Sequence, residues 1–114
     1  MKERPLAIPN KQDFILAIDQ GTTSSRSILF DKLGNITSQH QINTKQYFPK
    51  SSWVEQSPIE IWQNTQETLR QTIKIAELTS TRIAAMGISN QRETTVIWNR
   101  KTGRPIYNAI VWLD

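Results

Sequence analysis

One stretch decides how this chain begins to fold: FILAIDQGTTSSR, from Phe14 to Arg26. Its opening apolar run ends in an acid, a glutamine and a glycine, which is typical of a buried strand that breaks into a tight turn. A series of hydroxyl residues follows, and Arg26 opens the next apolar run at 27–30. The stretch therefore predicts two strands, roughly Phe14–Asp19 and Arg26–Asp31, joined by a polar turn.

The predicted turn is rich in short hydrogen-bond donors. Gly21 makes backbone N–H groups accessible, and hydroxyl side chains add to them. These side chains belong to Thr22, Thr23, Ser24 and Ser25. Donors clustered in this way suit phosphate oxygens, which are charged and accept several hydrogen bonds each. Asp19 would lie where a magnesium ion or its bound water bridges to those phosphates. The turn predicts ATP phosphate binding, and a plain hairpin with a polar turn is the alternative.

This turn differs from the Walker phosphate loop, because it lacks G-x-x-x-x-G-K-[ST] and leads into a strand. A strand–turn–strand unit with Asp-x-Gly-Thr at the turn instead resembles the actin-like ATPase superfamily, which includes the sugar kinases.

Length and composition limit the classes of function. The 114 residues are enough for one modest domain, and they carry a net charge of +4. Nucleic-acid binding needs a clustered stripe of lysine and arginine, which the sequence lacks. Without cysteine, disulfides and thiolate metal sites are excluded, and the single histidine, His40, argues against a histidine metal cluster. No apolar run approaches the roughly 20 residues of a transmembrane helix.

Residues 1–13 form a leader with mixed charge and two prolines, Pro5 and Pro9, which predicts a flexible segment. The leader lacks the hydrophobic region of a signal peptide. Together with the absence of cysteine, this favours the cytoplasm. We expect the folded part to span residues 14–114.

Beyond the second strand, Lys32–Asn35 predicts a turn because glycine and asparagine tolerate positive φ. A third strand is predicted from Ile36 to Tyr47, which makes an antiparallel meander of three strands. A loop at 49–52 leads to Trp53–Gln56.

Ser57-Pro58-Ile59-Glu60 predicts the start of a helix. Ser57 can cap it, Pro58 suits the first helical position, and Glu60 completes a reciprocal capping box. Apolar residues then recur along one predicted face for about 20 residues. They are Trp62, Leu69, Ile73 and Ala76. We therefore interpret Trp62 as a packing residue.

The short apolar run Ile83–Ile88 predicts a strand that is buried on both faces. Two further strands are expected at Thr94–Trp98 and Ile106–Trp112, with a loop at 99–105 between them. A meander followed by a helix and an apolar strand predicts an α/β domain with a mixed sheet.

A second polar cluster, Ser89–Thr95, begins where the apolar strand ends. Ligands gather at such carboxyl ends in open α/β sheets. Arg92 can donate to hydroxyl oxygens and Glu93 can accept their protons, which suits a polyol. An ordinary surface ion pair explains the same two residues. Trp112 can line the carbon side of a small polyol, or it can be a core residue.

Taken together, four segments resemble the amino-terminal part of the FGGY carbohydrate kinases, and among them those that phosphorylate glycerol. The segments are Ile18–Arg26, Trp53–Gln56, Ser89–Thr95 and Tyr107–Trp112. They occur in matching order, and the resemblance runs from Phe14 to Asp114. It implies the first lobe of an actin-like (ribonuclease H-like) fold, present here incompletely.

The resemblance also implies roles for single residues. Asp19 would be the acid near magnesium and the transferred phosphate, and it would hold the magnesium through water. The phosphate-contacting residues would be Gly21, Thr22, Thr23, Ser24 and Arg26. Arg92 and Glu93 would bind the glycerol hydroxyls, and Trp112 would pack against the glycerol carbons. The general-base aspartate would lie beyond residue 114.

The implied activity is the transfer of phosphate from ATP to glycerol, which yields sn-glycerol 3-phosphate. Members of the family are several times longer, so we expect the 114-residue chain to be inactive alone and the full-length enzyme to be a homo-oligomer. The alternatives are another polyol kinase of the family, or a non-catalytic truncated product that serves at most as a weak binding module.

Overall fold

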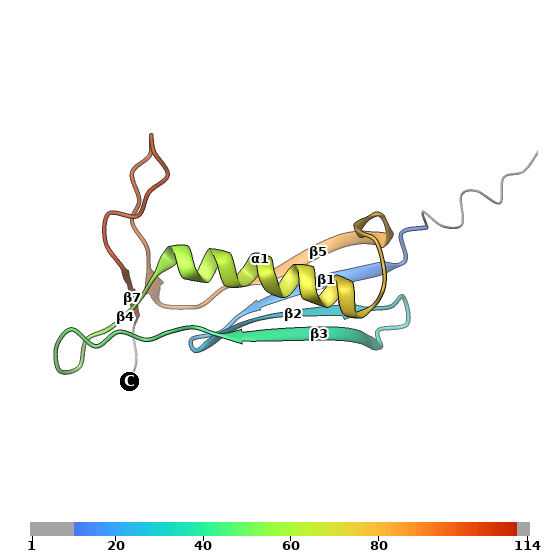
Figure 1. Ribbon diagram of the computed structural model, residues 1–114, viewed down its shortest axis with the longest axis horizontal. Helices are drawn as coiled ribbons and strands as arrows, with labels where there is room; N and C mark the ends of the chain where they lie inside the picture. Colours follow the sequence, from blue (N-terminus) through green and yellow to red (C-terminus); the bar gives the residue numbers. More distant parts are fainter. Residues whose placement is uncertain (1–10, 112–114) are drawn as a thin grey trace, which may run out of the picture.

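A mixed four-stranded sheet dominates the computed structural model, which describes residues 11–111. Strands β1 (Phe14–Gln20), β2 (Ser24–Phe30) and β3 (Ile36–Asn43) form an antiparallel meander. Strand β5 (Ile83–Ser89) pairs in parallel with β1, so the strand order is β3-β2-β1-β5 (Figure 1). The predicted meander and mixed sheet are confirmed.

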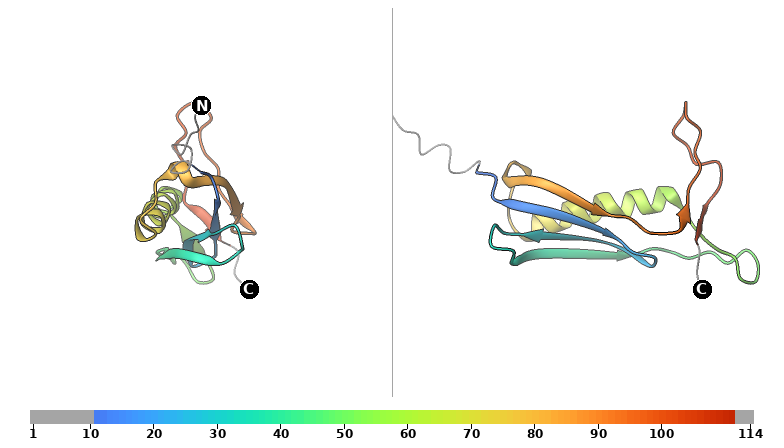
Figure 2. Two further views of the ribbon diagram at one scale, coloured as in Figure 1. Left: turned by 90° about the vertical axis from the view of Figure 1, so that its right-hand side faces the viewer. Right: turned by 180° about the vertical axis from the view of Figure 1, so that it is seen from behind.

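A second, smaller sheet lies beyond one end of the first (Figure 2). It contains β4 (Val54–Gln56), β6 (Thr94–Thr95) and β7 (Ala109–Val111) in the order β4-β7-β6. Helix α1 (Pro58–Ile75) follows β4 and lies across the meander, and the short 3-10 helix η2 (Ser80–Arg82) precedes β5. Within residues 11–111, no helix combines the length and apolarity needed to cross a membrane.

Three predicted strands are shorter in the structure. The third strand ends at Asn43, and Tyr47 forms only an isolated bridge with Glu55. The strand predicted at Thr94–Trp98 is limited to β6, and the strand predicted at Ile106–Trp112 is limited to β7, with Trp112 outside the described residues.

The start of α1 agrees with the sequence except for one contact. The Ser57 hydroxyl accepts a hydrogen bond from the Glu60 backbone N–H at 3.2 Å, and Pro58 occupies the first turn. The carboxylate of Glu60 instead accepts from the backbone N–H of Lys45 at 2.9 Å. The reciprocal half of the capping box is therefore replaced by a contact that ties the helix to the segment after β3.

The face that α1 turns to the sheet was wrongly predicted. Its buried residues are Thr65, Thr68 and Thr72, whereas Trp62 is 60% exposed. The reason is the chemistry of β2, which presents hydroxyl residues to the helix. Ser27 Oγ lies 2.8 Å from Thr68 Oγ1, so hydrogen bonds help to join the two layers, beside the buried Leu29 on the same face of β2.

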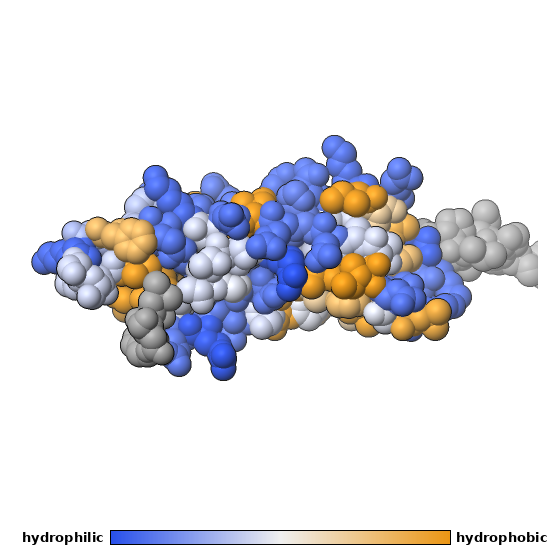
Figure 3. Space-filling model, turned by 90° about the horizontal axis from the view of Figure 1, so that it is seen from below, coloured by the Kyte–Doolittle hydropathy of each residue, from blue (hydrophilic) through white to orange (hydrophobic). Residues whose placement is uncertain are grey.

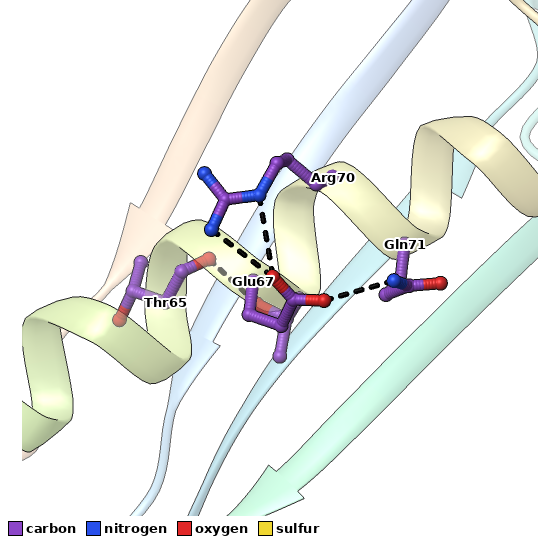
Figure 4. Close-up of polar contacts among 5 residues, drawn as sticks. Thr65, Glu67, Arg70 and Gln71 are labelled. Atoms are coloured by element: carbon purple, nitrogen blue, oxygen red, sulfur yellow. Dashed lines mark hydrogen bonds and ion pairs between the residues drawn. The ribbon is translucent and has the colours of Figure 1, made fainter.

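Beside the exposed Trp62, the surface of α1 carries a cluster of polar side chains around Glu67. Glu67 accepts hydrogen bonds from Arg70 at 3.0 Å and from Gln71 at 2.8 Å (Figure 4). These contacts, led by the one from Gln71, lower the pKa of Glu67.

The prediction that β5 is buried on both faces is also wrong. Met86 is 53% exposed and Ile88 is 70% exposed. Strand β5 is an edge strand, and α1 packs on β2 and β3 instead. Part of the apolar surface of the described residues is consequently exposed to solvent. Figure 3 shows hydrophobic patches, in orange, on one face of the molecule.

Candidate functional site

The two polar segments singled out in the sequence meet in one cavity. It has a volume of about 390 Å³ and is lined by residues 19–22 and 89–93. The meeting follows from the sheet, because the parallel register of β1 and β5 pairs Asp19 with Ser89. Both strands run in the same direction, so the turns that follow them emerge side by side at their carboxyl ends.

Asp19 and Arg26 form an ion pair at the mouth of the first turn. They are directly opposite on β1 and β2, and Arg26 Nη2 lies 3.0 Å from Asp19 Oδ2. Their side chains are 45% and 39% exposed, so solvent screens the attraction. Arg26 does not itself line the cavity and reaches it through Asp19.

The backbone of the first turn is held by its carbonyl groups. The Thr22 carbonyl accepts from Gln56 Nε2 at 2.5 Å and from Gln46 Nε2 at 3.4 Å, and the Thr23 carbonyl accepts from the Thr44 N–H at 2.8 Å. Among residues 11–111, the backbone N–H groups of Thr22 and Thr23 donate no hydrogen bond to another backbone group. This arrangement leaves donors at the turn for an anionic ligand.

Other donors predicted in this turn have partners inside the protein. The Gly21 N–H donates to the Ser24 carbonyl at 2.9 Å and closes the turn. Ser25 is fully buried and donates to Gln20 Oε1 at 2.7 Å, so its hydroxyl faces the helix layer and cannot serve a phosphate. Thr23 in the turn and Ser24 at the start of β2 do not line the cavity.

Arg92 and Glu93 lie on the opposite side of the cavity, in the turn between β5 and β6. Both are exposed, and neither takes part in a salt bridge among residues 11–111. Glu93 has a φ of 59°, which is the left-handed region that costs energy for any residue except glycine. Strain of this kind concentrates at functional sites.

Trp112, the third residue expected at the polyol site, lies outside the described residues. Strand β7 ends at Val111, which pairs with Val54 on one side and Thr94 on the other.

Glu55 and Gln56 belong to the Trp53–Gln56 segment, but no role was predicted for either residue, and both are buried in β4. Glu55 accepts from the Tyr107 hydroxyl at 2.6 Å and from Asn108 Nδ2 at 3.1 Å. The hydrogen bond between Tyr107 and Glu55 raises the pKa of Tyr107. Gln56 forms hydrogen bonds with Thr22 and Gln91, one residue from each of the two turns that line the cavity. Two polar residues within a short strand-forming segment are the feature that could have indicated a role for Glu55 and Gln56. The sequence alone does not show which groups they bond to.

Acidic groups are sparse at the cavity. Among the residues that the structure describes, no group of three histidine, cysteine, aspartate or glutamate side chains could hold a metal ion. The half-exposed carboxylate of Asp19 fits a magnesium ion that is held mainly by phosphate and water, which is the usual way proteins bind Mg²⁺.

Comparison with known proteins identifies the family. The chain matches the N-terminal domain of the FGGY family of carbohydrate kinases over residues 14–114. The chain belongs to this family. It is 57% identical over 102 residues to a glycerol kinase of Leifsonia xyli and 56% identical over 101 residues to one of Brucella anthropi, which covers 90% and 89% of the chain.

A solved structure agrees with this FGGY assignment. The glycerol kinase of Plasmodium falciparum, crystallised with ADP, matches 91% of the chain with a TM-score of 0.79 and 39% identity. The first lobe of an actin-like fold, present in part, is thereby confirmed. The chain spans 20% of the length of the two bacterial relatives and 21% of the Plasmodium chain.

Proposed function

We propose that this FGGY chain supplies the amino-terminal part of the site of a glycerol kinase, which transfers phosphate from ATP to glycerol. One observation carries the proposal: the turn after β1 and the turn after β5 line the same cavity. The glycerol kinase relatives, at up to 57% identity, support glycerol over other polyols.

The first turn would bind the ATP phosphates. The free N–H groups of Thr22 and Thr23 support this role, because oriented backbone donors bind anions without any change in charge. Gly21 and Ser24 would shape the turn, and Arg26 would balance negative charge beside it. Magnesium would supply charge neutralisation at the transferred phosphate, with Asp19 holding it through bound water.

The second turn would bind glycerol. Arg92 would donate to the hydroxyl oxygens and Glu93 would accept their protons, so each hydroxyl finds both of its partners. Trp112 would cover the glycerol carbons. A polyol is recognised this way only if both side chains stay free of internal ion pairs, as they are among residues 11–111.

Phosphoryl transfer depends on positioning and on the exclusion of water. We assign no general base among these residues and expect an aspartate outside this chain to provide it. The isolated chain should therefore bind ligands weakly and show no phosphorylation. The whole enzyme would act in the cytoplasm as a homo-oligomer, without nucleic acid as a partner.

Glycerol binding tests the proposal directly. Isothermal or NMR titration of the purified chain should detect glycerol, and Glu93→Gln and Arg92→Leu should each abolish the signal. The matched control is Arg100→Leu, which removes an exposed arginine from a loop outside this cavity. If all variants bound glycerol equally, Arg92 and Glu93 would be excluded as glycerol-binding residues. Titration with a panel of other polyols would reveal whether the chain prefers the substrate of another kinase of the family.

A non-catalytic product is the second candidate, favoured by the match to only 20% of the relatives' length. An antibody against this segment, used on lysate of the source cells, would decide between the two. A polypeptide mass several times 13.2 kDa, measured under denaturing conditions, supports the kinase. A mass near 13.2 kDa, with no phosphorylation of glycerol by that species, supports the non-catalytic product.

A further inference from the structure

Gln56 connects the two sides of the cavity. It is the last residue of β4, and it is fully buried. Its Nε2 donates to the Thr22 carbonyl at 2.5 Å, in the turn after β1. Its Oε1 accepts from Gln91 Nε2 at 3.1 Å, in the turn after β5. One side chain from the second sheet thus bonds to both turns of the first.

The turn after β5 has few other restraints. The ladder of β5 ends at Ser89 and that of β6 begins at Thr94. Arg92 and Glu93 form a short turn between these ladders, and the side chain of Gln91 makes its hydrogen bond to Gln56. This contact therefore restrains the position of Arg92 and Glu93 relative to the first turn.

The chemistry of the two contacts requires a neutral amide. A glutamine offers donors on nitrogen and an acceptor on oxygen, which match the Thr22 carbonyl and the Gln91 amide. A glutamate would retain the acceptor but would place a carboxylate oxygen against the carbonyl. In a fully buried position that mismatch is costly, because neither group can turn to water.

We propose that Gln56 is a positioning residue that sets the separation of the two turns. The inference rests on the proposed function in one respect: the separation of the turns would set the distance between the phosphate-binding donors and the polyol-binding side chains. Gln56 acts through Thr22 and Gln91 and does not itself line the cavity.

The separation of the turns can be measured directly. The chain has no cysteine, so Thr23→Cys and Asn90→Cys allow two nitroxide labels to be attached across the cavity at exposed positions. Pulsed electron resonance then gives the distribution of distances between them. We expect a narrow distribution in the otherwise unchanged chain and loss of the narrow component in Gln56→Glu.

Two further variants separate positioning from general loss of structure. Gln56→His keeps one donor and one acceptor and should restore the narrow component. Gln46→Glu alters the other side chain that donates to the Thr22 carbonyl, which makes no recorded contact with Gln91, and should leave the distribution narrow. Labels at Gln39 of β3 and Ala84 of β5 report whether the main sheet is intact.

A narrow distribution in Gln56→Glu, or a broad one in the chain with Gln56 present, overturns the inference. So does broadening of the Gln39–Ala84 distance to the same extent, because it would show a structural role only. No glycerol is needed for these measurements. If glycerol failed to bind, the proposed function would be rejected. The measured effect of Gln56 on the separation of the two turns would still stand.

Discussion

At the residue scale, buried polar side chains carry much of this structure. Among residues 11–111, the buried set holds nine polar or charged residues and five apolar ones. Ser27 and Thr68 are both fully enclosed, and their hydroxyl oxygens lie 2.8 Å apart. Thr68 also donates to the Thr65 carbonyl, so Ser27 is the donor within the pair. Paired hydroxyl groups therefore contribute to the packing of the helix on the sheet.

Thr68→Val should destabilise the chain by about 1–3 kcal/mol, because it leaves the buried Ser27 hydroxyl without this partner. The double variant Ser27→Ala/Thr68→Val should regain much of the loss, since both polar groups are then removed. Urea denaturation followed by circular dichroism measures the free energies of unfolding. A double variant whose loss equals the sum of the single losses would show that the pair is not coupled.

Glu93→Gly should raise the free energy of unfolding by about 1 kcal/mol, because glycine adopts a φ of 59° without the penalty of a side chain. The same substitution should abolish glycerol binding, since it removes the carboxylate. Glu93→Ala is the control that loses the carboxylate and keeps the strain. If Glu93→Gly were less stable than Glu93→Ala, the turn would not be strained.

At the element scale, α1 and β5 differ from what their sequences indicate, for related reasons. Hydrophobic periodicity identifies the apolar face of a helix or strand, but it does not identify the element that packs against that face. Helix α1 uses its threonines against β2, and β5 lies at an edge. The start of β5 is nevertheless well anchored, because Arg82 forms a 2.9 Å salt bridge with Asp13 just before β1.

Trp62→Ala should change the free energy of unfolding by only about 0.5 kcal/mol, as for most exposed sites. Leu29→Ala, at a fully buried position of β2, should cost about 2–5 kcal/mol. Denaturant midpoints of the two variants measure the difference. A loss at Trp62 as large as that at Leu29 would restore the interpretation of Trp62 as a packing residue.

Acid should weaken the anchor between β1 and β5. The hydrogen bond from Arg82 holds the pKa of Asp13 below its usual value of 3.8, so the folded state favours the charged carboxylate. The stabilisation is present above the usual pKa and is lost as pH falls through the lowered one. Wild type should exceed Asp13→Asn in stability at neutral pH, and the difference should vanish in acid. A difference that is independent of pH would contradict this assignment.

At the scale of the whole molecule, the described residues leave a large apolar surface open, including Ile15, Met86 and Ile88. Exposed surface of this kind favours association. The chain matches only 20% of the length of its bacterial relatives, so under the proposed function the cavity would form only part of the whole site.

The purified chain should therefore self-associate and lack kinase activity. Met86→Lys/Ile88→Lys should lower the association measured by light scattering, because it places charges on the open edge strand. Leu33→Lys, at an exposed turn outside the sheet, is the matched control. A glycerol phosphorylation rate that depends on ATP, from the 114-residue chain alone, would overturn the expected inactivity.

Much of the fold could be predicted from local sequence. The stretch from Phe14 to Arg26 determined two strands and their turn, because apolar runs, glycine and charge act over a few residues. Ser57 and Pro58 determined the start of α1 in the same way. The two polar turns were recognised for the same reason, since their chemistry lies in consecutive residues.

Only the tertiary structure decided what those local segments meet. The parallel pairing of β1 with β5 brought Asp19 beside Ser89, and no local pattern encodes that register. It also decided that Ser25 is buried, that Trp62 is exposed, and that Gln56 joins the two turns. The physical reason is that the burial and the hydrogen-bond partners of a residue are determined by segments that lie far from it in the sequence. The sequence lists those segments but does not show which of them come into contact.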